Sequence, residues 1–328
     1  MIDIVIVTSD RLQLLVECIR SLEVAALDLN IRVLIGFNGS TSSFIESAKK
    51  ILNSFRFLGG IKFFTLDKKW PGAARNELLR LAEADWIFFC DDDVLVPENI
   101  FKNFIALNKA FPKINVFGGP NITPPSSTPV ERAQGYALSL SLVTGPMNRR
   151  YSPYFKRSEL FVSGYLGLTL CNLFWKRMSS VFFPEDYICG EELHLLHSTP
   201  RPFVLSSQLS VYHFRRTTWR SFFQQTYKYG IGRAHESFLV IPAVWLLAVA
   251  LLTIVILKPV VLLLLSTLFA VAILMQAVGL IRRQHEKLNL IYLTMFAAFL
   301  IWTGYTLGMM FGRMNQILFK PKLTYAES

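Results

Sequence analysis

The sequence predicts an α/β domain built on a mostly parallel, Rossmann-like sheet, followed by a C-terminal segment of transmembrane helices. Apolar, β-rich runs alternate with helical patterns in the first part of the chain, which is typical of such a sheet. Long uncharged runs follow residue 237, and hydrophobic residues make up 52% of the 328 residues against 17% charged. We therefore expect one body over 1–237, membrane helices over 238–312 and a tail over 313–328.

The N-terminal body is expected to contain five strands and at least four helices. The strands are expected at 3–8, 32–37, 61–66, 86–90 and 114–118, and the helices at about 12–24, 43–55, 72–82 and 99–110. Continuous apolar strands separated by helices indicate a sheet covered on both faces. Ligands of such sheets bind outside the carboxyl ends of the strands, so polar residues at strand ends are candidate site residues.

Three uncharged runs, at about 238–257, 260–281 and 288–312, are long enough to cross a hydrocarbon core of roughly 30 Å. The basic loop 282–287 predicts a cytosolic side for that connection. The N-terminus lacks the features of a signal peptide, which also predicts a cytosolic body. We expect a multi-pass protein of the inner, cytoplasmic membrane. A tail outside fits the charges of Arg313, Lys320 and Lys322 poorly, so a tail along the inner face stays open.

The formal charge of +11 predicts acidic partners, which could be nucleic acid, anionic lipid or a diphosphate. Nucleic acid is disfavoured because the arginines cluster beside the membrane segment rather than among exposed aromatic residues. The four cysteines have no pairing or metal-type spacing. We interpret them as small core residues of a reducing compartment.

The strongest chemical signal is the acidic triplet 91–93, which directly follows the apolar strand 86–90. Unpaired carboxylates are unfavourable in such a place, and a divalent cation that also binds substrate phosphates would stabilise them. Alternation along an extended segment would put Asp91 and Asp93 on one face and Asp92 on the other. The alternative is an acidic turn before the next helix.

Two further segments carry candidate groups. In 70–76 a Pro-Gly pair opens a helix, and Arg75 on its first turn could reach a phosphate or brace the triplet. Glu191 and Glu192 precede a helical pattern, where a helix cap is the ordinary interpretation and a general base the functional one.

The segment before the membrane runs contains His213 and several arginines. His213 ends a short apolar strand and is a candidate metal ligand, although a single histidine is more often structural. Arg215, Arg216 and Arg233 could contact a diphosphate or lipid headgroups, and a solvated basic face is the alternative.

Taken together, these motifs resemble the family-2 inverting glycosyltransferases with the GT-A fold, over about residues 1–236. The matching segments are 4–11, 71–76, 91–93, 170–173, 190–192 and 229–233, the last resembling membrane-attached members that build bacterial exopolysaccharides. The sequence departs from the family at Phe37, where relatives usually carry a base-reading aspartate, so the nucleobase stays open. The Gln-x-x-Arg-Trp motif of processive synthases is missing from 224–228, which implies single sugar transfers.

The resemblance implies a site for a nucleotide-sugar donor. Donor-binding residues would be Thr8, Asp10, Arg11, Asn38, Arg75, Asp91 and Asp92, and Mg²⁺ or Mn²⁺ would be held by Asp93, Asp91 and His213. Either Glu192 or Glu191 would be the catalytic base, with Glu192 the usual position. The acceptor would be a polyprenyl-linked or other glycan. Transfer to a polyprenyl phosphate, or a membrane-tethered nucleotide-sugar sensor without turnover, are the alternatives.

Overall fold

The computed structural model describes residues 1–152, 159–162, 167–187, 189–234 and 259–319. The chain divides into two compact units. The first unit is built on Met1–Ser127 and Pro146–Phe214, and the second on Thr128–Gly145 and Arg215–Lys322. The boundary expected near residue 237 lies outside the described residues, as does the expected membrane helix 238–257.

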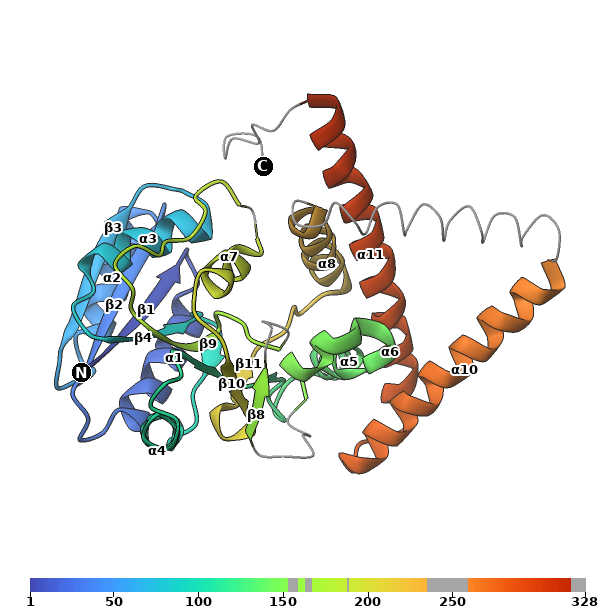
Figure 1. The fold of residues 1–328 in the computed structure, drawn as a ribbon, viewed down its shortest axis with the longest axis horizontal. Helices are drawn as coiled ribbons and strands as arrows, with labels where there is room; N and C mark the ends of the chain where they lie inside the picture. The colour runs from blue at the N-terminus through green and yellow to red at the C-terminus, as the bar shows by residue number, and fades with distance from the viewer. Residues whose placement is uncertain (153–158, 163–166, 188, 235–258, 320–328) are drawn as a thin grey trace. The chain divides into compact units, whose positions relative to one another are not determined.

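The first unit contains an eight-stranded sheet with the order β3-β2-β1-β4-β9-β6-β10-β8 (Figure 1). The strands are β1 (Ile2–Thr8), β2 (Ile31–Asn38), β3 (Ile61–Leu66), β4 (Trp86–Cys90), β6 (Val116–Gly118), β8 (Glu159–Val162), β9 (Asn172–Lys176) and β10 (Phe203–Ser206). Strands β3, β2, β1 and β4 are parallel neighbours, and β9 runs antiparallel between β4 and β6. The predicted, mostly parallel α/β sheet is confirmed.

Helices cover both faces of this sheet. Helices α1 (Leu12–Ala25), α2 (Ser42–Leu52) and α4 (Ile100–Ala110) contribute to one core cluster, whereas α3 (Pro71–Leu81) and α7 (Glu191–His197) contribute to the other. Successive residues of β1 point to opposite faces, so Ile4 and Ile6 join the first cluster while Val5 joins the second. The core therefore fixes the orientation of the residues at the end of β1.

A second sheet has three short strands that come from widely separated parts of the sequence. It has the order β5-β11-β7, with β5 at Val94–Leu95, β7 at Asn121–Ile122 and β11 at Val211–His213. The antiparallel pair β5–β11 aligns His213 with Val94. This register places His213 next to the acidic triplet, although 120 positions separate the two in sequence.

The observed elements of the first 110 residues agree closely with those expected from the sequence. The largest difference is in α2, which ends at Leu52 rather than at residue 55. Asn53 follows the helix and its amide still bonds the carbonyl of Lys49, after which Ser54 and Phe55 form turns. Strands β8, β9 and β10 were not expected, because their residues are few and show no alternation.

The second unit is helical. It contains α5 (Pro129–Ser139), α6 (Ser141–Thr144), α8 (Trp219–Ala234), α10 (Pro259–Arg283) and α11 (Leu290–Phe319). Helix α5 begins at a capping box, in which Thr128 bonds the amide of Glu131 and Glu131 bonds the amide of Thr128. Two short 3₁₀ segments, Gly145–Arg150 and Ser207–Leu209, complete the described helices, and both lie wholly or mostly in the first unit.

Two helices are long and apolar enough to cross a membrane. By length and composition, the candidate spans are Leu263–Arg283 in α10 and Leu290–Asn315 in α11. Helix α10 contains the run expected at 260–281, and α11 begins at Leu290, two residues after the start of the run expected at 288–312.

Candidate active site

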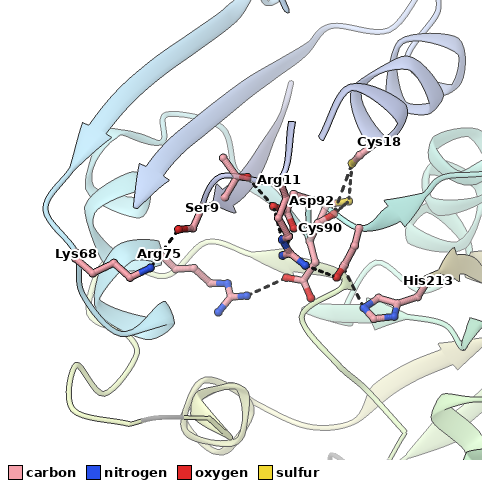
Figure 2. A network of polar contacts seen from close by, with 11 residues as sticks. Ser9, Arg11, Cys18, Lys68, Arg75, Cys90, Asp92 and His213 are labelled. Atoms are coloured by element: carbon pink, nitrogen blue, oxygen red, sulfur yellow. Dashed lines mark hydrogen bonds and ion pairs between the residues drawn. The ribbon is translucent and has the colours of Figure 1, made fainter. Parts of the chain in front are cut away.

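The acidic triplet lies at the carboxyl end of β4, beside the end of β1 (Figure 2). It forms a turn between β4 and β5 rather than an extended segment. Asp92 is nevertheless separated from its two neighbours, because its side chain is fully buried against the end of β1. Asp91 and Asp93 remain together on the other side, next to His213.

Asp92 is held by two residues from the first strand and its loop. The hydroxyl of Thr8 donates to Asp92 at 2.6 Å, and the guanidinium of Arg11 donates to both carboxylate oxygens. Burial raises the pKa of Asp92 to about 7, although the Arg11 charge opposes the shift. Arg11 also reaches Asp93 at 2.7 Å. One guanidinium thus contacts two adjacent carboxylates.

Three side chains form a candidate metal centre. Ligand atoms of Asp91, Asp93 and His213 all lie within 4.8 Å of one another. The imidazole Nε2 of His213 lies 3.2 Å from Asp93 Oδ1. Two carboxylate oxygens and one imidazole nitrogen are a donor set that fits a divalent cation such as Mn²⁺, while Mg²⁺ usually takes only oxygen ligands. The residues present therefore fit Mn²⁺, one of the two ions that the resemblance implies.

Arg75 connects the triplet to the acidic pair. It lies on the first turn of α3, which opens with Pro71, and its guanidinium donates to Asp91 at 3.0 Å and to Glu191 at 2.5 Å. Its side chain is only 11% exposed. Burial raises the pKa of Glu191 to about 7, and the charge of Arg75 acts against that shift.

The two glutamates of the pair differ in their surroundings. Gly190 has a left-handed backbone conformation (φ 87°) and starts α7, so both acids lie on its first turn. Glu191 is buried against Arg75, whereas Glu192 contacts Arg150 at 3.4 Å. Arg150 ends the 3₁₀ segment Gly145–Arg150 and was not predicted from the sequence. No sequence pattern marks it, because only the fold brings it to α7.

The remaining predicted donor residues of the first unit lie on or next to strands β1 and β2. Asp10 is exposed in the loop after β1, with a left-handed backbone (φ 53°). The amide of Asn38 exchanges two hydrogen bonds with the backbone of Lys69, so this side chain fixes the loop before α3. Lys68, which was not predicted, donates to Ser9 at 3.1 Å (Figure 2).

Phe37 does not lie at a strand end open to a ligand. Its side chain is fully buried in the core between Phe44 and Phe63. Phe37 therefore contributes to the packing of the core, and any residue that recognises a nucleobase lies elsewhere.

The predicted basic contacts belong to the second unit. Arg216 exchanges backbone hydrogen bonds with the side chain of Gln134 on α5, and Arg233 lies on the last turn of α8. The role expected for Arg215, Arg216 and Arg233 stays a prediction.

Comparisons with known proteins give one matching family model and similar solved structures. The family model described as Glycosyl transferase family 2 matches residues 3–177. No curated protein sequence matches the chain. The mannosyltransferase PcManGT from Pyrobaculum calidifontis, solved in complex with GDP-Man and Mn²⁺, superimposes with a TM-score of 0.52 at 13% identity, over 98% of this chain and 88% of that one.

Two structures of TarS from S. aureus are also similar. Residues 1–349 of TarS, solved in complex with UDP-GlcNAc, give a TM-score of 0.47 at 15% identity, over 73% of this chain and 67% of that one. A longer TarS chain gives 0.46 at 15% identity, and the match spans 40% of its length.

Proposed function

The chain belongs to glycosyl transferase family 2, and from this premise we propose that it moves a sugar from a nucleoside-diphosphate-sugar to a hydroxyl of a glycan acceptor with inversion. The observation that carries the proposal is that the acidic triplet and the glutamate pair lie close together at the carboxyl ends of the strands. Asp91 and Asp93 lie with His213, and Glu191 is joined to Asp91 through Arg75. Such an arrangement suits a reaction with a charged leaving group and a hydroxyl nucleophile.

Asp91, Asp93 and His213 would hold Mn²⁺ or Mg²⁺. The bound ion supplies positive charge that stabilises the departing nucleoside diphosphate. Asp92, fixed by Thr8 and Arg11, keeps the turn in the conformation that leaves its two neighbours together. PcManGT was solved with GDP-Man and Mn²⁺, which supports a nucleotide-sugar and a metal in this fold.

Glu192 is the group we assign as general base. It takes the proton of the acceptor hydroxyl as that oxygen attacks the anomeric carbon, and the bond to the diphosphate breaks in the same step. Glu191 is buried and forms an ion pair with Arg75, so it holds Arg75 in contact with Asp91. Arg150 contacts Glu192 at 3.4 Å and helps to hold its carboxylate in position.

The acceptor that we propose is a polyprenyl-diphosphate-linked glycan, used at the cytosolic face of the membrane in cell-surface polysaccharide biosynthesis. Two apolar helices in the second unit and the basic loop 282–287 support attachment to a membrane. A lipid-linked acceptor and an enzyme attached to the same bilayer meet in two dimensions rather than three.

The test is a transfer assay on membranes that contain the full chain. Labelled nucleotide-sugars of several bases and sugars are supplied with Mn²⁺ or with a chelator, and lipid-extractable label is measured. We expect label in a lipid-linked glycan with at least one donor, and only with metal. Donor binding without any turnover would favour a sensor. Label on a polyprenyl phosphate, unaffected by Glu192→Gln, would favour the other acceptor class.

A further inference from the structure

Helix α11 has two unlike faces. One face is exposed and apolar toward both ends of the helix, and it is half-buried at Thr303 between them. Its exposed apolar side chains are Tyr292, Phe296, Phe299, Leu307, Met310 and Met314. The opposite face is buried and made largely of small residues: Thr294, Ala297, Ala298, Gly304, Gly308 and Gly312. The buried face is thus built for another helix, whereas the described residues leave the side chains of the other face exposed.

Helix α8 occupies the small-residue face. A Cβ added at Gly308 would collide with the carbonyl oxygen of Tyr227, and one at Gly230 would collide with that of Tyr305. The contacts follow the two helices in the same direction, from the rings of Trp219 and Phe296, 5.1 Å apart, to the hydrogen bond from Arg313 to the carbonyl of Ala234. Helix α8 therefore lies along α11 over most of its candidate span.

The outer face of α8 is polar. Arg220, Gln224 and Lys228 are exposed and four residues apart, while Phe222, Thr226 and Gly230 are buried toward α11. The two helices together make a layer with a charged outer face and an apolar opposite face. A layer of this kind fits the boundary between water and lipid.

We infer that α11 lies along the membrane surface, with its Tyr292–Met314 face in the lipid and α8 on its aqueous side, and does not cross the bilayer. If α11 crossed, the parallel α8 would carry Arg220 and Lys228 into the depth of the acyl chains, where charged groups are very unfavourable. The occupant of the apolar face is therefore the surface of a lipid bilayer. This inference differs from the expectation of a membrane span at 288–312, where the structure has a candidate span by length and composition.

The loop between α10 and α11 agrees with this placement. Glu286 accepts a 2.5 Å hydrogen bond from Arg132 and a 2.9 Å bond from Tyr136, both on α5. The loop is thus fixed to a helix whose capping box and charged residues belong in water. Helix α10 differs, because residues 263–271 are exposed on every side and need lipid all around.

The inference also accounts for the charges in the last turns of α11 and after it. Arg313, Lys320 and Lys322 fit poorly on the outer side of a membrane, but an α11 that stays at the cytosolic surface leaves them inside.

Side-specific cysteine labelling tests the inference. Cys18, Cys90 and Cys171 are buried, so the full chain with Cys189→Ser is the background, and Lys287→Cys and Asn315→Cys report the two ends of α11. Ser43→Cys, exposed on α2, reports the side of the first unit. A membrane-impermeant maleimide is applied to sealed inside-out and right-side-out vesicles. All three variants should label in the same vesicle orientation. Labelling of Asn315→Cys in the opposite orientation to Lys287→Cys would overturn the inference.

A depth measurement gives an independent result. A fluorophore is attached to a cysteine placed at Phe296, Leu307 or Met314, and quenching by lipids with shallow or deep nitroxides is compared. For a helix in the surface, all three sites should be quenched more by the shallow lipid. Strongest deep quenching at Leu307 alone is the pattern of a crossing helix and contradicts the inference. Neither experiment needs sugar transfer, so the inference, which rests only on the proposed membrane attachment, fails or stands separately from the proposed reaction.

Discussion

At the residue scale, Arg75 is the side chain on which the two halves of the site depend. Its guanidinium contacts both Asp91 and Glu191, two acids that are 100 positions apart in sequence. Asp91 is a candidate metal ligand, and Glu191 precedes the candidate base. A change at Arg75 therefore affects both ends of the site.

We predict that Arg75→Met abolishes measurable transfer and lowers the free energy of unfolding by about 3 kcal/mol, because it leaves Glu191 buried without its cation. Arg80→Met, a change on the same helix at a half-exposed arginine, is the matched control and should shift stability by less than about 0.5 kcal/mol. Chemical denaturation of the solubilised chain checks both values. Equal effects of the two variants would refute the role assigned to Arg75.

A second residue-scale prediction concerns the metal centre. Asp93→Asn should raise the Mn²⁺ concentration for half-maximal transfer by at least about tenfold, because a neutral amide is a weaker ligand for a divalent cation. His213→Ala should act in the same direction. The measurement is a Mn²⁺ titration of the transfer rate, with the exposed Asp67→Asn as control. An unchanged Mn²⁺ requirement in Asp93→Asn would exclude this carboxylate as a ligand.

The sequence predicts the carboxylates of the site better than it predicts their partners. Asp91 and Asp93 could be located because they directly follow a buried strand, where a carboxylate is unfavourable unless it has a positively charged partner. Arg150 could not, because nothing in its own segment distinguishes it from a surface arginine. Arg150 and Glu192 are 42 positions apart, and no local pattern encodes their pairing.

At the element scale, one buried ion pair fixes β1 to β2 and to the loop before β4. Asp3 accepts hydrogen bonds from Arg32 at 2.7 and 2.8 Å and from the amides of Glu83 and Ala84. Burial would raise the pKa of Asp3, but the bonds from Arg32 and the two amides outweigh it and hold the pKa below 3.8. The Asp3–Arg32 pair therefore stabilises the end of the sheet that lies opposite the candidate active site.

The lowered pKa of Asp3 determines how the stability contributed by the Asp3–Arg32 pair changes with pH. The stabilisation is present above the unfolded-state pKa near 3.8 and is lost as pH falls through the lower folded-state value. Asp3→Asn should lower the free energy of unfolding by about 3 kcal/mol at pH 7, and the difference from the wild type should shrink below pH 3.8. Denaturation curves at pH 7 and pH 3 measure this. A difference that grows at pH 3, or one equally present in the exposed control Asp28→Asn, would refute it.

The packing of α8 on α11 gives another element-scale prediction. Gly308→Ala should lower stability by about 1–3 kcal/mol, since its Cβ meets backbone that cannot move freely. Gly279→Ala on α10 is the control, because nothing lies within 4 Å of a Cβ there, and it should be neutral or stabilising. Thermal unfolding in lipid nanodiscs compares them. An unaffected Gly308→Ala would show that the two helices do not pack as described.

The elements themselves could be predicted unevenly. Strands β1 to β4 and helices α1 to α4 follow clear periodicities with turn residues between them, and their expected limits lie within a few residues of those observed. Strands β5 and β7 have two residues each, too short to show a period, whereas the short apolar strand that ends at His213 was expected and is β11. Their pairing nevertheless carries His213 to the triplet, so an important part of the site came from contacts that the sequence does not display.

At the scale of the whole molecule, the chain does not divide at a single point. The segment Thr128–Gly145 joins the helices that follow residue 214, although it lies within the matched family region 3–177. The sequence indicated the apolar helices by composition but gave no sign that α5 would pack with them. Such exchange between distant segments depends on tertiary contacts, as between Ala133, Ile281 and Leu290.

The most direct measurement of the central claim is the rate of sugar transfer by Glu192→Gln and Glu191→Gln with Mn²⁺ and a saturating donor. If Glu192 removes the acceptor proton, Glu192→Gln should lose about 10²–10⁴-fold in rate and still bind the nucleotide. Glu191→Gln should instead lose stability together with activity, because Arg75 would keep only Asp91 as its charged partner. A Glu192→Gln enzyme that transfers sugar at the wild-type rate would contradict the account.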